Sequence, residues 1–153
     1  MQFKNCLMLC QLLNDQVGAS PLNTTLTSAE LAVISEIETT SSLLRLVTRL
    51  PGLRFAAIAK VTDSSWTACA VYDELNFGLD AGHELKLENT FCNELRLNRQ
   101  PIVINEVATD PEYAQHFIPA KFGFQSYFSL PIIFPTGDFF GTLCGLDPLP
   151  KKL

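Results

Sequence analysis

Two long strand-like segments near the C-terminal end of the sequence limit the possible folds more than any other feature. Residues 124–134 and 139–146 are almost continuously apolar, and the turn-forming sequence Pro-Thr-Gly-Asp at residues 135–138 joins them. A strand that is apolar at nearly every position has to be covered on both faces. The pattern therefore predicts the centre of an antiparallel sheet between two layers of other elements.

The turn also allows the register of this hairpin to be estimated. If Phe134 lies opposite Phe139, one face of the sheet carries the more apolar set, namely Phe124, Ser126, Phe128, Leu130, Ile132, Phe139 and Leu143. The more mixed face carries Tyr127, Ser129, Pro131, Thr142 and Cys144. Ligand sites combine an apolar lining with a few polar groups, so we expect this second face to form the wall of a pocket.

The segments before the hairpin alternate between helical and strand-like patterns. Thr27 and Glu30 have the spacing of a capping box, and apolar residues then recur at helical intervals until Pro51 and Gly52. Beyond that point the patterns predict strands at 54–62, 66–72, 83–87 and 102–104, a helix at 88–99 with Asn89 or Thr90 as its N-cap, and a turn-rich loop at 105–121. We expect one α+β domain at residues 26–150, after an N-terminal extension or linker at 1–25.

The first helix has a second possible role. Five of its residues fall on a 3-4-3-4 seam of the kind that packs against a partner helix: Ile34, Ile37, Ser41, Leu44 and Thr48. This spacing predicts a homodimer that forms through the helix. The alternative is that the same stripe covers the sheet of its own domain, and the sequence leaves both possibilities open.

Charge and cysteine usage limit the partners and the compartment. The formal net charge is −5, and basic residues cluster nowhere beyond Lys151 and Lys152, which argues against nucleic acid and anionic membranes as partners. The five cysteines are widely spread and form no CxxC pair, as expected in a reducing cytoplasm. The apolar stretch at 6–13 is short and interrupted by Gln11, so we expect neither a signal peptide nor a membrane span.

Several short motifs now stand out in a recognisable order. They are Thr90-Phe91-Cys92-Asn93-Glu94, Gln100-Pro101-Ile102-Val103-Ile104, Asp110-Pro111, the segment from Gly123 to Pro131 and the segment from Phe139 to Pro148. Together, from about Arg45 to Pro148, they resemble the GAF domains of bacterial sensor histidine kinases and other multidomain signalling proteins, phytochrome relatives included.

The resemblance implies both a fold and a role. The fold is a GAF/PAS-like antiparallel sheet of five or six strands, with helices on one face and a loop-roofed pocket on the other. The role is that of a regulatory sensor domain that binds a small molecule or mediates dimerisation, with an output domain in the same protein. In the family an outgoing helix often follows where residues 151–153 stand here, so we expect either a fragment or signalling without that helix.

Seven residues are candidates for contact with a small-molecule ligand: Cys92, Asn93, His116, Tyr127, Ser129, Thr142 and Cys144. The first turn of a helix favours a thiolate at Cys92, although a free cysteine is more commonly a buried and inert side chain. His116 could contact a ligand or titrate near neutral pH, although a solvated loop histidine is the commoner case.

The main alternative is an enzyme similar to the free methionine-(R)-sulfoxide reductases, which also have a GAF fold. In that family the nucleophilic cysteine lies where this chain has residues 116–120, which include no cysteine. A covalent bilin is not expected, because neither histidine adjoins a cysteine, and the scattered histidines and cysteines make no metal-ligand set. We therefore expect no catalytic residue, no metal and no fixed cofactor. A purely structural dimerisation module without a ligand remains the third possibility.

Overall fold

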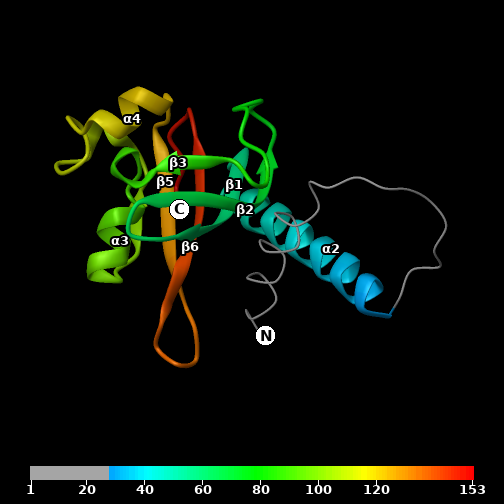
Figure 1. Cartoon of the computed structure of the whole chain (residues 1–153). Helices are drawn as coiled ribbons and strands as arrows, with labels where there is room; N and C mark the ends of the chain where they lie inside the picture. The colour runs from blue at the N-terminus through cyan, green and yellow to red at the C-terminus, as the bar shows by residue number, and fades with distance from the viewer. Residues whose placement is uncertain (1–27) are drawn as a thin grey trace.

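A computed structural model describes residues 28–153 of the protein (Figure 1). A six-stranded sheet in the order β3-β2-β1-β6-β5-β4 forms its centre, and every neighbouring pair of strands is antiparallel. The strands are β1 (Phe55–Val61), β2 (Ser65–Asp73), β3 (Glu84–Lys86), β4 (Ile102–Ile104), β5 (Ser126–Ile133) and β6 (Phe139–Asp147). The expected α+β class with a central antiparallel sheet is confirmed.

Helices lie on both sides of this sheet. The long helix α2 (Ser28–Arg49) packs on β1 and β2, while α3 (Cys92–Asn98) packs on β5 and β6. Figure 1 shows α3 and α4 (Phe117–Phe122) on the side away from α2. Two short 3-10 turns, η1 (Leu87–Asn89) and η2 (Val107–Thr109), complete the described elements. The sheet is therefore covered by α2 on one face and by short helices and loops on the other.

The helix predicted at 88–99 is divided in two. The residues of η1 turn first, and α3 then begins at Cys92 with Phe91 as the residue before it, without a side-chain cap. The prediction of Asn89 or Thr90 as N-cap was therefore wrong. The Thr90 hydroxyl instead donates a hydrogen bond to the Leu87 carbonyl oxygen at 2.9 Å, which closes the preceding turn.

The register predicted for the long hairpin is confirmed from Ser126 to Ile132, and it shifts by one position only at the turn. Ile133 lies opposite Phe139 and Ile132 lies opposite Gly141, so Phe140 is an extra residue that forms a β-bulge. The bulge reverses the alternation at the start of β6, and Phe139 packs with the cluster on the α3 side while Phe140 packs with the cluster under α2. Phe124, which precedes β5, also lies on the α3 side.

Strand β1 contributes side chains to both layers. Phe55 and Ala57 belong to the larger hydrophobic cluster on the α3 side, and Ala56 and Ile58 belong to the smaller cluster under α2. On the neighbouring strand, a Cβ atom at Gly141 would lie 1.9 Å from the Ala59 carbonyl oxygen. Only glycine therefore allows β6 to pair with β1 at this distance.

The described part of α2 covers its own sheet. Leu44 is fully buried in the cluster under α2, and the buried Thr48 hydroxyl bonds to the carbonyl oxygens of Leu44 and Arg45. Ser41, by contrast, is exposed. Leu44 and Thr48 are therefore not available to a partner helix as the seam required. The side chains of Ile34 and Ile37, like the extension at 1–25, lie outside the described residues.

An ion pair joins the end of the sheet to its beginning. Arg54, just before β1, donates two hydrogen bonds of 2.8 Å to the carboxylate of Asp147, the last residue of β6. Burial raises the pKa of Asp147, but the hydrogen bonds from Arg54 and from the Leu149 N–H outweigh it, and the pKa is lowered. Asp147 is therefore ionised, and it fixes where the chain enters and leaves the sheet.

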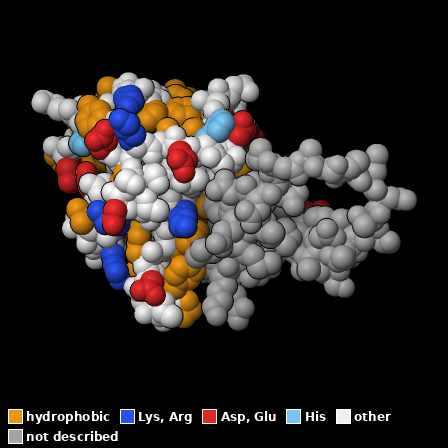
Figure 2. Space-filling model, viewed as in Figure 1, with side chains coloured by type: hydrophobic (Ala, Val, Ile, Leu, Met, Phe, Trp, Pro, Cys, Tyr) orange, Lys and Arg blue, Asp and Glu red, His pale blue; other side chains and the backbone are white. Residues whose placement is uncertain are grey.

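On the side that Figure 2 shows, acidic and basic side chains are interspersed, and they form no large patch of one charge. Within residues 28–153, no helix combines the length and the apolar character that a membrane span requires.

Candidate ligand cavity

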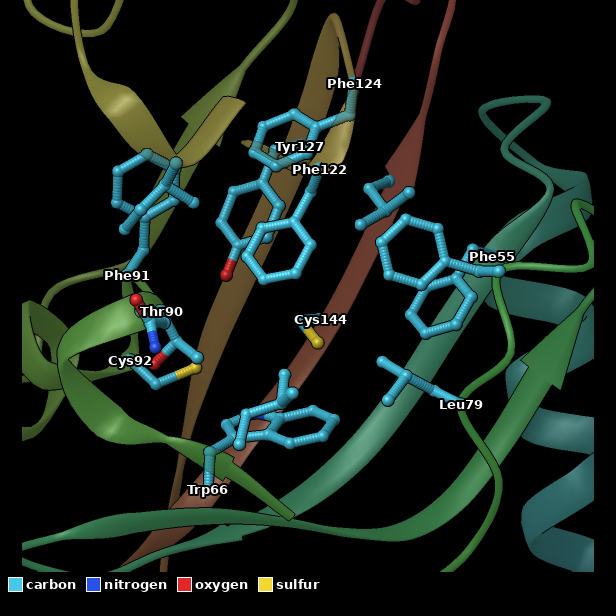
Figure 3. A pocket seen from close by; sticks show the side chains of 15 residues that line it. Phe55, Trp66, Leu79, Thr90, Phe91, Cys92, Phe122, Phe124, Tyr127 and Cys144 are labelled. Carbon is cyan, nitrogen blue, oxygen red and sulfur yellow. The ribbon is translucent and has the colours of Figure 1, made fainter. Parts of the chain in front are cut away.

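A small cavity lies between the sheet and the elements that cover its α3 side (Figure 3). Its volume is about 50 Å³. The residues that line it come from five strands, from η1, α3 and α4, and from the loops between these elements: Phe55, Trp66, Phe77, Leu79, Leu85, Asn89, Thr90, Phe91, Cys92, Ile118, Phe122, Phe124, Tyr127, Cys144 and Leu146. This is the face of β5 and β6 that the sequence predicts as a pocket wall.

The floor of the cavity is formed by the sheet. Tyr127 and Cys144 share this face because Tyr127 pairs with Leu146, and Cys144 pairs with Ser129, two residues further along β5. Trp66 of β2 is the only tryptophan of the chain, and 3% of its surface is exposed. Its fluorescence can therefore report on the contents of the cavity.

The roof includes a loop that one carboxylate holds in place. The Asp73 carboxylate, at the end of β2, accepts hydrogen bonds from the backbone N–H groups of Leu75 (2.8 Å), Phe77 (2.7 Å) and Gly78 (3.2 Å). The Phe77 ring then packs against the ring of Phe55, with 5.4 Å between the ring centroids. Residues 74–82, which we call the roof loop, thus direct Phe77 and Leu79 into the cavity.

A second part of the roof centres on Phe91, which is 1% exposed. Its ring centroid lies 5.0 Å from that of Tyr113, 4.9 Å from His116 and 5.2 Å from Tyr127. Aromatic pairs at these distances stabilise each other beyond the burial of their area. Phe91 therefore joins the loop before α4 to the floor of the cavity.

Polar groups gather at one end of the cavity. The Cys92 sulfur lies 3.3 Å from the Thr142 hydroxyl oxygen, within hydrogen-bond distance for sulfur. Burial raises the pKa of the Cys92 thiol more than its hydrogen bonds with Thr142 and Thr90 lower it, and burial also raises the pKa of Cys144. At neutral pH both thiols are protonated. The helix N-terminus does not make Cys92 a thiolate, because burial dominates.

Ser129 of β5, which pairs with Cys144 of β6, is a further polar residue beside this end of the cavity. It is fully buried, and its hydroxyl has no hydrogen-bond partner of ordinary geometry in the part of the chain that the structure describes. Its proximity still lowers the pKa of Tyr127, although burial and the neighbouring thiols of Cys92 and Cys144 raise that pKa overall. A buried hydroxyl without a partner is uncommon in folded proteins.

The structure brings together five of the seven predicted ligand residues. Cys92, Tyr127 and Cys144 line the cavity, and Ser129 and Thr142 lie buried beside it on the same face. The two others lie elsewhere. They are Asn93, which lines a surface hollow beside η1, and His116, which lines another hollow beside α4.

His116 has a structural role at its position. Its Nδ1 accepts a hydrogen bond of 3.3 Å from the Ile118 N–H and so caps the start of α4. Its ring stacks on Phe117 with 5.1 Å between the centroids. His116 therefore touches the cavity only indirectly, through Phe91.

The sequence analysis missed the roof loop, Trp66 and Thr90. A signal for the loop was present, because Leu75, Phe77 and Leu79 alternate with polar residues and glycine in a segment too irregular for a strand. Apolar side chains at such a spacing have to be buried against another part of the molecule. Among the residues that the structure describes, no group of three His, Cys, Asp or Glu side chains could hold a metal ion.

Comparison with solved structures gives the same fold at low sequence identity. A protein described as a GAF sensor from Burkholderia vietnamiensis is similar over 98% of this chain and 82% of its own, with 14% identity and a TM-score of 0.56. The GAF domain region of a protein from Geobacter sulfurreducens is similar over 83% of this chain and 85% of its own, with 18% identity and a TM-score of 0.61.

An enzyme shares the fold as well. The type II free methionine-R-sulfoxide reductase of Thermoplasma acidophilum is similar over 76% of this chain and 77% of its own, with 13% identity and a TM-score of 0.55. Among curated proteins, no relative matches the chain. Residues 35–152, most of the sequence, match the family model of the GAF domain. The chain therefore belongs to the GAF domain family, whose fold is generally one of regulation and signalling.

Proposed function

We propose that this domain is the regulatory sensor of a longer cytoplasmic signalling protein and that it binds a small molecule in the cavity. The observation that carries the proposal is the cavity itself, which is closed by a loop that a single carboxylate holds. The motifs that resemble bacterial sensor histidine kinases favour a two-component system, with the output domain in the same chain. The domain itself has no catalytic role in this proposal.

Strand β1 provides a physical route from the cavity to α2. Its alternate residues contact the two layers, with Phe55 on the cavity and Ile58 in the cluster that contains Leu44 of α2. A ligand that binds one arrangement of β1 better than another would therefore change the packing of α2. The size of the effect is limited by the difference in affinity for the two arrangements.

The proposed homodimer uses a different surface of α2 from the one the seam predicted. Leu44 and Thr48 are occupied by the domain's own sheet, whereas Leu46, on another side of α2, is 55% exposed. We propose that this exposed side of α2 contacts the partner helix. Light scattering of the purified chain checks this, and a monomer at all concentrations would contradict it.

The state of the thiols supports a non-catalytic role. A thiolate is the reactive form of cysteine, and burial keeps Cys92 and Cys144 protonated. The position where the resemblance implies the nucleophile of the reductases has no cysteine in residues 116–120. Reduction of free methionine sulfoxide by the purified chain, lost in Cys92→Ser, would overturn this part of the proposal.

Ligand binding can be tested by thermal unfolding in the presence of a library of metabolites. A ligand at a concentration about 100 times its Kd stabilises the folded state by about 2.7 kcal/mol, which is easily measured as a higher Tm. We expect at least one compound to raise the Tm in a saturable way. If none does, the domain is a structural dimerisation module instead.

A matched pair of variants links the effect to the cavity. Cys144→Leu places extra volume in the cavity and should abolish the rise in Tm. Leu143→Met changes the neighbouring residue, which packs in the cluster under α2, and should leave the rise intact. A compound that stabilises both variants equally binds elsewhere.

A further inference from the structure

The side chains around the cavity restrict the charge of what can bind there. We propose that the cavity selects an uncharged molecule with a small apolar body and one hydrogen-bonding group, and that it rejects carboxylates, phosphates and cations. This inference rests on the proposed function, because it names the class of molecule that the same cavity binds.

Among the residues that the structure describes, the lining contains no charged side chain, and its members are apolar or aromatic apart from Asn89, Thr90, the tyrosine hydroxyl and two thiols. The carboxylate of Asp73, at the start of the roof loop, already accepts three backbone hydrogen bonds. An ion moved from water into such surroundings without a countercharge loses its hydration, and nothing there replaces it, so its cost of burial is far larger than that of a neutral polar group. A charged ligand therefore has nothing in the cavity to compensate its desolvation.

The few polar groups occupy one end. Figure 3 shows Thr90, Cys92 and the hydroxyl of Tyr127 on one side of the cavity, with Phe55 and Leu79 on the other. The Tyr127 hydroxyl and the Cys92 thiol are both protonated at neutral pH, so each can donate to a neutral oxygen acceptor. The ligand therefore points its carbonyl or hydroxyl group toward Cys92 and Tyr127, and its apolar body toward Phe55 and Leu79.

The volume sets the size of the ligand. A cavity needs about 10–15 Å³ to hold one water molecule, and an engineered apolar cavity of about 150 Å³ holds benzene. The volume of about 50 Å³ found here lies between these values. A molecule of a few heavy atoms fits the cavity as it stands. A larger ring requires the roof loop to move and Phe77 to leave the cavity.

The test compares two probes of the same shape and different charge. Isobutyramide and isobutyrate are nearly isosteric, and at neutral pH only the second carries a charge. Each is titrated into the purified chain while the fluorescence of Trp66 is recorded, because this residue is the only tryptophan and lines the cavity. We expect a saturable change with isobutyramide and at least an about tenfold higher Kd for isobutyrate. Isobutylamine, as the cation, should also bind at least about tenfold more weakly.

Variants confirm the place of binding. Cys144→Leu should remove the response to isobutyramide, and Leu143→Met should keep it. The comparison of the three probes on the unaltered chain does not depend on either variant, so a variant that fails to fold leaves the test valid.

Two results overturn the inference. One is binding of isobutyrate or isobutylamine as tight as that of isobutyramide, and the other is the absence of any response to isobutyramide. Neither result removes the proposed function if a compound of another class raises the Tm in the metabolite library. Failure of the whole library, by contrast, removes the sensor function itself.

Discussion

The Asp73 carboxylate offers the sharpest test of how the cavity is closed. In Asp73→Asn the side chain keeps its shape, but one of the two acceptor oxygens becomes an NH₂ group that can only donate. The carboxylate uses one oxygen for the Leu75 N–H and the other for the N–H groups of Phe77 and Gly78. The variant can therefore satisfy only one of these two sets, and the roof loop loses at least one of its bonds.

The size of the effect follows from the number and exposure of these bonds. A hydrogen bond to a charged acceptor contributes about 1.5–3 kcal/mol, and bonds at the surface contribute less because water replaces them. The Leu75 and Phe77 bonds are partly buried, whereas the Gly78 bond is exposed. We therefore expect the roof loop to open more easily by about 2 kcal/mol, which raises the open population roughly thirtyfold.

Hydrogen exchange and fluorescence quenching measure this opening directly. Amide exchange at Phe77 should accelerate by the same factor, and acrylamide should quench Trp66 more strongly once the loop opens. The matched control is Asp63→Asn. The Asp63 side chain is 93% exposed and pairs with Arg96 at the surface, so this variant should change neither measurement. Equal exchange at Phe77 in Asp73→Asn and in the unaltered chain would refute the role of Asp73.

Three further results are expected. Phe91→Ala should lower the free energy of unfolding by about 3–5 kcal/mol in chemical denaturation, because Phe91 is 1% exposed. Phe117→Ala should lower it by less than about 1 kcal/mol, because Phe117 is 54% exposed. Equal losses in the two variants would contradict the packing described. Because the pKa of Asp147 is lowered, its contribution to the free energy of unfolding is complete above the unfolded-state pKa of about 3.9 and is lost as the pH falls toward the folded-state pKa. When the pH is lowered past about 4, the Tm should therefore decrease, and it should decrease less steeply in Asp147→Asn. Iodoacetamide at neutral pH should leave Cys92 unmodified by mass spectrometry until urea unfolds the chain; rapid modification in the folded state would contradict its raised pKa.

Sequence patterns predicted the strands of the sheet where residues close in sequence determine the strand and its ends. Residues 102–104 lie between Pro101 and a polar loop, and they form β4 within the predicted bounds. The bulge at Phe140 could not be predicted, since an inserted apolar residue leaves an apolar run unchanged and only pairing with the neighbouring strand reveals it. The prediction of a cap at Thr90 failed for a related reason, because its hydroxyl closes the preceding turn instead.

The candidate site was predictable where it lies on strands and hidden where it lies in loops. The alternation along β5 and β6 placed Tyr127 and Cys144 on one face, and the structure shows both in the cavity. His116 was expected there because it lies in a loop near the pocket, yet its ring caps α4 and is separated from the cavity by Phe91. The path of a loop is decided by tertiary contacts such as those of Asp73, which no local pattern encodes.

The ion pair between Arg54 and Asp147 has a mechanical consequence. It lies where the chain from α2 enters β1 and where the chain leaves β6, and these two strands are paired with Phe55 opposite Leu146. Polypeptide attached before and after the sheet would thus emerge from the same end of two adjacent strands. A pulling force applied there would separate the strands one pair at a time, as a zipper opens, and the Arg54–Asp147 pair would be the first contact to bear the load.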